Sequence, residues 1–319
     1  MNAAAPQPAG AARPRRIARV EHAGRPWLAL LGEDSATLLP HHGGSMVALI
    51  EGGDEALAEL CAAAARGEGE VVPLAGLRLL APLDRFRRDV LCTGWNYWRH
   101  FEESRGKREG QEVDTPKAPT FFTKGPDTVI GPCDDIAWDP IVSAKWDYEA
   151  EVALVIGRGG RSIPRARAMD HVWGYCLAND VSQRDLQRRH GGQWLKGKSV
   201  DGTMPIGPWI VPAADIDPAA LRLVCEVNGE VRQDASTALM AFPIDELIAE
   251  LSFGMTLHPG DLLLTGTPAG IGNAMEPPRF LTDGDEVVVR ADGLGELRNR
   301  LRATDLHGGS DIVIGGAPA

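Results

Sequence analysis

Acidic residues alternate along one short segment of the sequence, WDYEAEVALVIGRG. Because successive side chains of a β-strand point to opposite faces, Asp147, Glu149 and Glu151 are expected on the same face. Carboxylates held side by side repel one another unless a cation or a proton joins them. Oxygen ligands at this spacing suit Mg²⁺, Mn²⁺ or Ca²⁺, whereas Zn²⁺ prefers His and Cys. The segment predicts a divalent-metal site, and the alternative is a solvated acidic strand edge.

A second group of polar residues follows the strand-like segment WGYCLAND. Asp180 stands where this strand should meet a turn, which is a common position for a metal ligand or for the N-cap of a helix. Arg184, Gln187 and Lys198 come after it. Taken alone, Arg184 could equally be a surface ion-pair residue and Lys198 a solvated charge.

A histidine and a glutamate have helical spacing in GWNYWRHFEES. His100 and Glu103 are at positions i and i+3, so they share a helix face. A carboxylate beside an imidazole fixes its tautomer and raises its basicity, as a water-activating general base requires. The alternative is a surface helix pair.

The segment GDLLLTGTPAGIG predicts a strand followed by a tight turn rich in Gly and Pro. Such a turn offers Thr265, Thr267 and backbone N–H groups to an anion. A turn without a ligand is the alternative.

The elements that must position these residues are mostly short strands. From Asp89 onward, apolar runs such as DVLCTGWN, EVALVIG, LRLVCEVNG and DEVVVRA are separated by Gly, Pro and Asp. This pattern favours a sandwich, roll or barrel over a parallel α/β sheet. Helical patterns occur at NYWRHFEESRG and PIDELIAELSFG. The predicted fold class is α+β, predominantly β.

Composition shifts divide the chain into segments. Residues 1–16 predict a disordered tail, 17–81 a small N-terminal α+β domain, 82–305 the main domain, which contains the candidate catalytic residues, and 306–319 a C-terminal tail. Within the main domain, ESRGKREGQEVDTPKAP predicts a long exposed loop or lid, because it is polar, charged and contains Gly.

Charge and composition limit the class of partner. The formal net charge of −11 argues against binding of nucleic acid. No apolar run approaches the ~20 residues of a membrane span. The five cysteines are scattered and form no C-x-x-C motif, which is typical of reduced thiols. These features predict a cytoplasmic protein that binds neither nucleic acid nor a membrane.

Taken in order, the motifs resemble the fumarylacetoacetate hydrolase (FAH) superfamily, in particular its bacterial acylpyruvate hydrolases and hydroxyhepta-diene-dioate isomerases. The resemblance covers Asp89 to Leu301 and includes the segments GWNYWRHFEE, PTFFTKGPDTVIGP, DYEAEVALVIGR, ANDVSQRDLQ, KGKSVDGTMPIGP, VNGEVRQ, LTGTPAGIG and FLTDGDEVVVRADGLGELRN. It implies a mixed β-sandwich roll with a smaller N-terminal domain, assembled as a homodimer.

The resemblance also implies a metal site with a charged neighbour. Glu149, Glu151 and Asp180 match the family's carboxylate ligands of Mg²⁺ or Mn²⁺. Lys198 matches the lysine that stabilises negative charge on a small 2-oxo acid substrate.

Further positions match the family's lid and substrate-binding groups. His100 and Glu103 match the pair that activates water. Positions matched to groups near the substrate are Lys124, Arg184, Gln187 and Thr267. Trp95 and Gln183 depart from the family's usual residues, and Trp95 predicts an unusual distal end of the substrate.

The implied function is metal-dependent hydrolysis of a carbon–carbon bond in a 2,4-dioxo acid, such as an acylpyruvate or fumarylpyruvate from the catabolism of aromatic compounds. The products would be pyruvate and an acid, and hydrolysis is favoured because both members of the His100 and Glu103 pair are present. Oxaloacetate decarboxylation and isomerisation of a hydroxymuconate or hepta-diene-dioate are alternatives on the same site. A non-catalytic metal- or ligand-binding protein of this fold is the alternative from another class.

Overall fold

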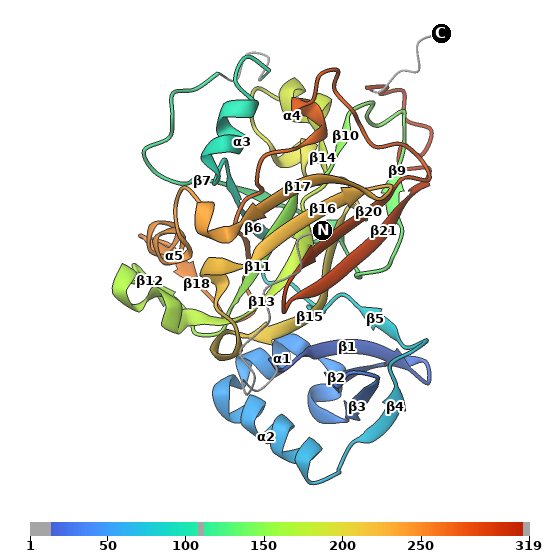
Figure 1. The fold of residues 1–319 in the computed structure, drawn as a ribbon, viewed down its shortest axis with the longest axis vertical. Coiled ribbons are helices and arrows are strands. Elements are labelled where there is room, and N and C mark those ends of the chain that lie inside the picture. Colours follow the sequence, from blue (N-terminus) through green and yellow to red (C-terminus); the bar gives the residue numbers. More distant parts are fainter. Residues whose placement is uncertain (1–13, 108–111, 315–319) are drawn as a thin grey trace, which may run out of the picture.

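The computed structural model describes residues 14–107 and 112–314 (Figure 1). The α-helices are α1 (Met46–Glu51), α2 (Gly53–Ala65), α3 (Trp98–Glu103), α4 (Arg184–Arg189) and α5 (Ile244–Ser252). The strands are β1 (Ile17–His22), β2 (Arg25–Leu31), β3 (Ser35–Leu39), β4 (Glu70–Pro73), β5 (Arg78–Leu80), β6 (Val90–Gly94), β7 (Thr120–Lys124), β8 (Val129–Ile130), β9 (Ile136–Trp138), β10 (Trp146–Asp147), β11 (Ala150–Ile156), β12 (Gly160–Arg161), β13 (Val172–Asn179), β14 (Ser182–Gln183), β15 (Met204–Pro212), β16 (Arg222–Val227), β17 (Glu230–Ser236), β18 (Thr256–Leu257), β19 (Leu262–Leu264), β20 (Glu286–Ala291) and β21 (Gly295–Ala303).

Two sheets contain most of these strands. The large sheet has 12 strands in the order β4-β3-β2-β1-β15-β13-β11-β19-β6-β7, with β5 paired to β1 and β8 paired to β15. The small sheet has five strands in the order β17-β16-β20-β21-β9. Strands β10 and β14 form a separate pair, as do β12 and β18. The prediction of a predominantly β, α+β fold is confirmed.

The centre of the large sheet is covered on both faces. Val152 and Leu154 of β11 pack in one core cluster with Val289 of β20 in the small sheet. Ala153 and Val155 point the other way and belong to a second cluster, which also contains residues of α1 and α2. Burial on both faces explains why β11 is an unbroken apolar run. Figure 1 shows the small sheet lying over β11 and β13.

The N-terminal strands continue the large sheet. β1 is antiparallel to β15, with Ile17 opposite Ile210. In α2, Leu57, Leu60 and Ala63 are buried at helical spacing, so this Ala-rich helix packs through one face. These strands thus share one sheet with the body of the chain. The division into domains at residues 81 and 82 stays a prediction.

Parts of the predicted tails and lid lie outside the described residues. These parts are residues 1–13, 108–111 and 315–319. Arg15, assigned from the sequence to the N-terminal tail, is bonded to Asp215 through its Nε at 2.7 Å. Residues 112–119 of the predicted lid form neither helix nor strand. Within the described ranges, no helix is long and apolar enough to cross a membrane.

Candidate active site

The acidic segment does not form one continuous strand, so that prediction is wrong. β10 ends at Asp147 and pairs with β14, whereas β11 begins at Ala150 and pairs with β13. The Asp147 carboxylate accepts the N–H groups of Gly272 and Asn273 at 2.7 and 3.1 Å. Asp147 therefore holds a loop and does not belong to the carboxylate cluster described next.

Glu149, Glu151 and Asp180 form that cluster. Each offers one carboxylate oxygen, these three oxygens lie within 4.8 Å of one another, and all three side chains are buried. Glu149 precedes β11, Glu151 lies on it, and Asp180 follows the neighbouring β13. The N–H of Asp180 donates to the carbonyl of Glu149 at 2.8 Å, which holds the two strand ends together. Asp180 is not the N-cap of α4, because Gln183 occupies that position.

Three cations surround the cluster. Lys198 Nζ lies 2.6 Å from Glu149 Oε2 and 2.6 Å from Asp180 Oδ2. Lys124 Nζ lies 2.8 Å from Asp180 Oδ1, and Arg184 Nη2 lies 2.7 Å from Glu149 Oε1. All three cations are buried, so a surface role for Arg184 and a solvated Lys198 are both wrong.

The positive charge is unevenly distributed over the cluster. Burial alone would raise the pKa of Glu149, but Lys198 and Arg184 outweigh it and hold the pKa below its ordinary value. Burial raises the pKa of Glu151 well above its ordinary value, and repulsion from Asp180 and Glu149 adds to the rise. The Glu151 side of the cluster therefore carries less positive charge than the Glu149 side. Its carboxylate oxygens suit a divalent cation such as Mg²⁺ or Mn²⁺.

A histidine–glutamate pair lies on α3, and its histidine lines the same pocket as Glu149 and Glu151. His100 Nδ1 is 2.8 Å from Glu103 Oε1. The second oxygen of Glu103 accepts the N–H of Gly270 at 2.8 Å. His100 is buried, so a surface helix pair is wrong.

One pocket brings most of the predicted residues together. Those that line it are Trp95, His100, Glu149, Glu151, Arg184, Gln187, Lys198 and Thr267. Glu103, Lys124 and Asp180 are not part of the lining, although each contacts a member of the site. Arg184 Nη1 donates to Gln187 Oε1 at 3.1 Å, and Thr267 Oγ1 donates to the carbonyl of Ala150 at 2.9 Å.

Sequence reasoning missed an aromatic wall of this pocket. Trp194 packs edge-on against Trp95, with ring centroids 4.8 Å apart, and against Phe122 at 5.1 Å. Lys107, Arg188 and Asn273 also line the pocket and were not predicted. No local spacing pattern links these residues, because they come from separate loops and elements.

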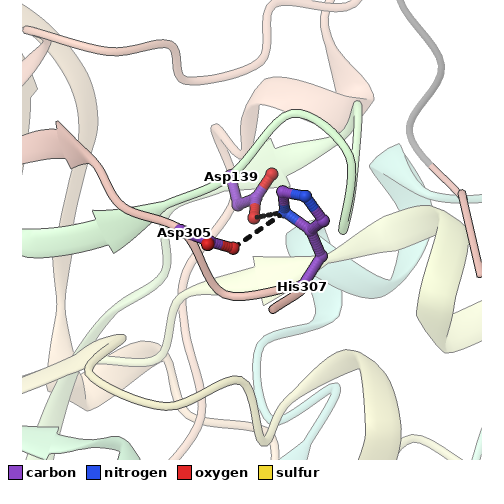
Figure 2. Close-up of side chains that lie close together, drawn as sticks. All are labelled: Asp139, Asp305 and His307. Carbon is purple, nitrogen blue, oxygen red and sulfur yellow. Dashed lines mark hydrogen bonds and ion pairs between the residues drawn. The ribbon is translucent and has the colours of Figure 1, made fainter. Parts of the chain in front are cut away.

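A second group of ionisable side chains lies away from the pocket (Figure 2). His307 Nδ1 lies 2.9 Å from Asp139 Oδ2 and 3.1 Å from Asp305 Oδ1. Asp139 also accepts the N–H groups of Ile141 and Leu306, so both of its oxygens are engaged. We interpret the group as a clasp that holds the C-terminal segment beside β9, and not as a metal site.

Comparisons with known proteins agree with this architecture. The family model described as fumarylacetoacetate (FAA) hydrolase, C-terminal, matches residues 89–302. Among solved structures, the fumarylacetoacetate hydrolase of Exiguobacterium antarcticum is 36% identical with a TM-score of 0.78, covering 91% of this chain and 100% of that one. Maleylpyruvate hydrolase of Sphingobium sp. SYK-6, solved with manganese (II) ion and pyruvate, is 26% identical with a TM-score of 0.73, covering 91% and 100%.

The chain belongs to the fumarylacetoacetate hydrolase family, and the resemblance inferred from its motifs is confirmed. Among its curated relatives, the oxaloacetate tautomerase YisK of Bacillus subtilis is 43% identical over 229 residues, 72% of this chain and 74% of that protein. The human mitochondrial oxaloacetate tautomerase FAHD2A is 42% identical over 233 residues, 72% of this chain and 71% of that protein. These relatives support an enzyme of this family.

Proposed function

We propose that this enzyme catalyses enolisation of a small 2-oxo diacid, with keto–enol tautomerisation of oxaloacetate as its principal reaction. The observation that carries the proposal is the placement of Glu149, Glu151, Lys198 and His100 around one pocket. Enolisation needs a sink for negative charge beside a group that exchanges a proton, and this pocket contains both. The oxaloacetate tautomerases among the relatives favour tautomerisation over the other reactions of the family.

Glu149, Glu151 and Asp180 would hold Mg²⁺ or Mn²⁺, with Ca²⁺ as the third candidate, because their oxygens form a hard donor set. When bound there, the ion supplies a Lewis acid that polarises the 2-oxo group and favours the enolate. The description of maleylpyruvate hydrolase with manganese and pyruvate supports this assignment.

The chain's own residues divide the remaining work. Lys198 would stabilise negative charge on the substrate oxygen through its buried ammonium group. Glu103 accepts the Nδ1–H of His100, which leaves the Nε2 lone pair to move a proton between the substrate carbon and the enolate oxygen. Arg184 and Thr267 line the part of the pocket where the substrate's carboxylate groups would lie.

Other groups position these residues. Lys124 neutralises the outer oxygen of Asp180, and Gln187 accepts a hydrogen bond from Arg184. Trp95 and Trp194 close one side of the pocket and would exclude water from the enolate.

Hydrolysis of a 2,4-dioxo acid is a second candidate, favoured by the same histidine–glutamate pair. His100 oriented by Glu103 could instead take a proton from water, which would attack the distal carbonyl. Decarboxylation of oxaloacetate would use the charge sink around Lys198 without this pair.

One experiment separates these reactions. Metal-loaded protein is given enol oxaloacetate, keto oxaloacetate and an acylpyruvate, and enol–keto interconversion, CO₂ release and pyruvate release are followed in parallel. We expect enol–keto interconversion to be fastest and to stop after treatment with EDTA. Acylpyruvate cleavage without tautomerisation above the buffer rate would transfer the assignment to hydrolysis.

We also propose that the chain forms a homodimer and works in the cytoplasm. Phe253 and Leu239 are large apolar side chains with 81% and 55% exposure, and burial against a second copy would remove them from water. None of the five cysteines forms a disulfide, which fits a reducing compartment. Light scattering of the purified protein checks the first proposal, and fractionation of cells checks the second.

A further inference from the structure

We propose that Gln233 is a positioning residue that joins the metal-ligand strand to the substrate loop (residues 265–270). The inference rests on the metal site of the proposed function and names a residue that the motifs did not single out. Gln233 belongs to β17, the edge strand of the small sheet, and is the only fully buried residue of that strand.

A β-bulge turns this side chain inward. Cys225 of β16 lies opposite Gln233, whereas the next residue, Glu226, lies opposite Val231. Arg232 is therefore an extra residue in β17. Bulges of this kind bend a strand and redirect its side chains. An edge strand that otherwise faces solvent thus contributes one amide to the interior.

All the hydrogen bonds of this amide go to the site. Its Oε1 accepts the N–H of Ala150 at 3.0 Å. Its Nε2 donates to Thr267 Oγ1 at 2.8 Å and to the Pro268 carbonyl at 2.7 Å. The orientation of the amide follows from these partners, since an N–H needs an oxygen acceptor and a carbonyl needs a donor.

The first arm of the amide, its Oε1 atom, holds β11, the strand that begins between the metal ligands Glu149 and Glu151. Ala150 stands between Glu149 and Glu151, so its peptide sets the direction in which both carboxylates point. The substrate loop returns to the same strand, because the N–H of Gly266 donates to Glu151 Oε2 at 2.5 Å. A shift of the loop would therefore move a metal ligand.

The second arm, the Nε2 atom, holds the middle of the substrate loop, two residues before Gly270. A Cβ atom at Gly270 would collide with the Arg232 carbonyl, so the loop packs directly on the bulge. The N–H of Gly270 holds Glu103, which in turn orients His100. Gln233 is thus connected to both the metal ligands and the proton-transfer pair without touching the substrate.

The test uses Gln233→Met, which removes the amide and keeps a similar volume. We expect Mn²⁺ affinity, measured on metal-free protein, and kcat each to fall by about 10–100-fold, the effect typical of losing a group that orients metal ligands. Asn299→Leu is the matched control. Asn299 is another buried amide of the small sheet, and it donates to the carbonyls of Gly131 and Asp134 away from the pocket. This variant should lose thermal stability and keep Mn²⁺ affinity.

Gln233→Asn replaces the methionine variant if that variant does not fold. The shorter side chain keeps the amide but cannot bond both Ala150 and the substrate loop. We expect a smaller loss of Mn²⁺ affinity in this variant. Variants of Gln233 that bind Mn²⁺ and turn over substrate no worse than Asn299→Leu would overturn the inference while the metal site stands. A wild-type protein without Mn²⁺ affinity would overturn the proposed function, and the inference with it.

Discussion

Single residues of the site differ in what their removal leaves behind. Glu149 and Asp180 are each paired with buried cations, whereas Glu151 is held by a backbone N–H and repelled by its neighbours. Removing one member of a buried ion pair strands a charge, which is far more costly than breaking a surface pair. Substitutions in this small volume should therefore give distinguishable results.

Glu151→Gln is expected to weaken metal binding and leave the fold intact. The amide still accepts the N–H of Gly266, and loss of the carboxylate relieves repulsion from Asp180 and Glu149. Calorimetry should show Mn²⁺ affinity lowered by at least about tenfold, since even an indirect partner of a ligand is worth that much. The exposed Glu59→Gln variant is the control. Unchanged affinity in Glu151→Gln would remove this residue from the ligand set.

His100→Ala and Lys198→Ala should affect different reactions. Positioned acid–base catalysis contributes about 10²–10⁴ in rate, so His100→Ala should slow tautomerisation and acylpyruvate cleavage by that factor with metal content unchanged. Lys198→Ala should damage every reaction, including decarboxylation, because it removes charge from the common sink. Rates are compared with those of Lys196→Ala, which alters an exposed lysine. Wild-type rates in His100→Ala would exclude the histidine from both mechanisms.

At the scale of elements, the segment that follows α3 is fastened to the rim of the pocket. Lys107 Nζ donates to the carbonyl of Ala274 at 2.7 Å, and Glu103 is held by the N–H of Gly270. These contacts attach a loop without regular structure to the pocket, as expected of a lid.

We predict that a substrate analogue such as oxalate, added with Mn²⁺, slows hydrogen exchange in the predicted lid between Glu102 and Pro119. Closure over the ligand would shield backbone N–H groups around Arg105 and exclude water from the site. Arg108, a second expected cleavage site for proteases, lies outside the described residues. Exchange and proteolysis that are identical with and without oxalate would contradict closure.

The clasp in Figure 2 predicts pH-dependent attachment of the C-terminal segment. The hydrogen bond to Asp139, together with the charge of Asp305, raises the pKa of His307 above its ordinary value. A raised folded-state pKa contributes stability that is complete below the unfolded value of about 6.5 and is lost as the pH rises through the folded value. Hydrogen exchange of residues 305–314, corrected for intrinsic rates, should therefore be faster at alkaline than at mildly acidic pH.

His307→Gln should abolish this pH dependence, because the amide does not titrate. An NMR titration of His307 gives the pKa directly. A value at or below that of a free histidine would contradict the clasp.

At the scale of the whole molecule, a divalent cation held by Glu149, Glu151 and Asp180 would join strands that come from different parts of the chain. The ligand carboxylates lie at the ends of β11 and β13, and Lys198 reaches them from the segment before β15. A ligand that binds only the folded state adds about 2.7 kcal/mol of stability at 100 times its Kd. EDTA should therefore lower Tm and abolish turnover, and Mg²⁺ or Mn²⁺ should restore both. Full activity of a metal-stripped sample would disprove the metal requirement.

Much of this protein follows from local spacing. Alternation of residues and the positions of Gly and Pro predict short strands, and the predominantly β fold follows from them. The i, i+3 spacing of His100 and Glu103 predicts their contact, because a helix brings such residues together wherever it lies. The motifs identify the family because they follow one another in the family's order. Each of them contains charged residues or turn residues at characteristic positions.

Tertiary structure determines which residues from distant segments of the sequence come into contact. The break between Asp147 and Ala150 arises because the two halves of the acidic segment pair with different strands. The burial of Lys198, the contact of Trp194 with Trp95 and the reach of Gln233 from the small sheet depend on how sheets and loops pack. Local pattern sets the residues that an element presents, but only packing sets the partner that each one meets and the charge that each one must neutralise.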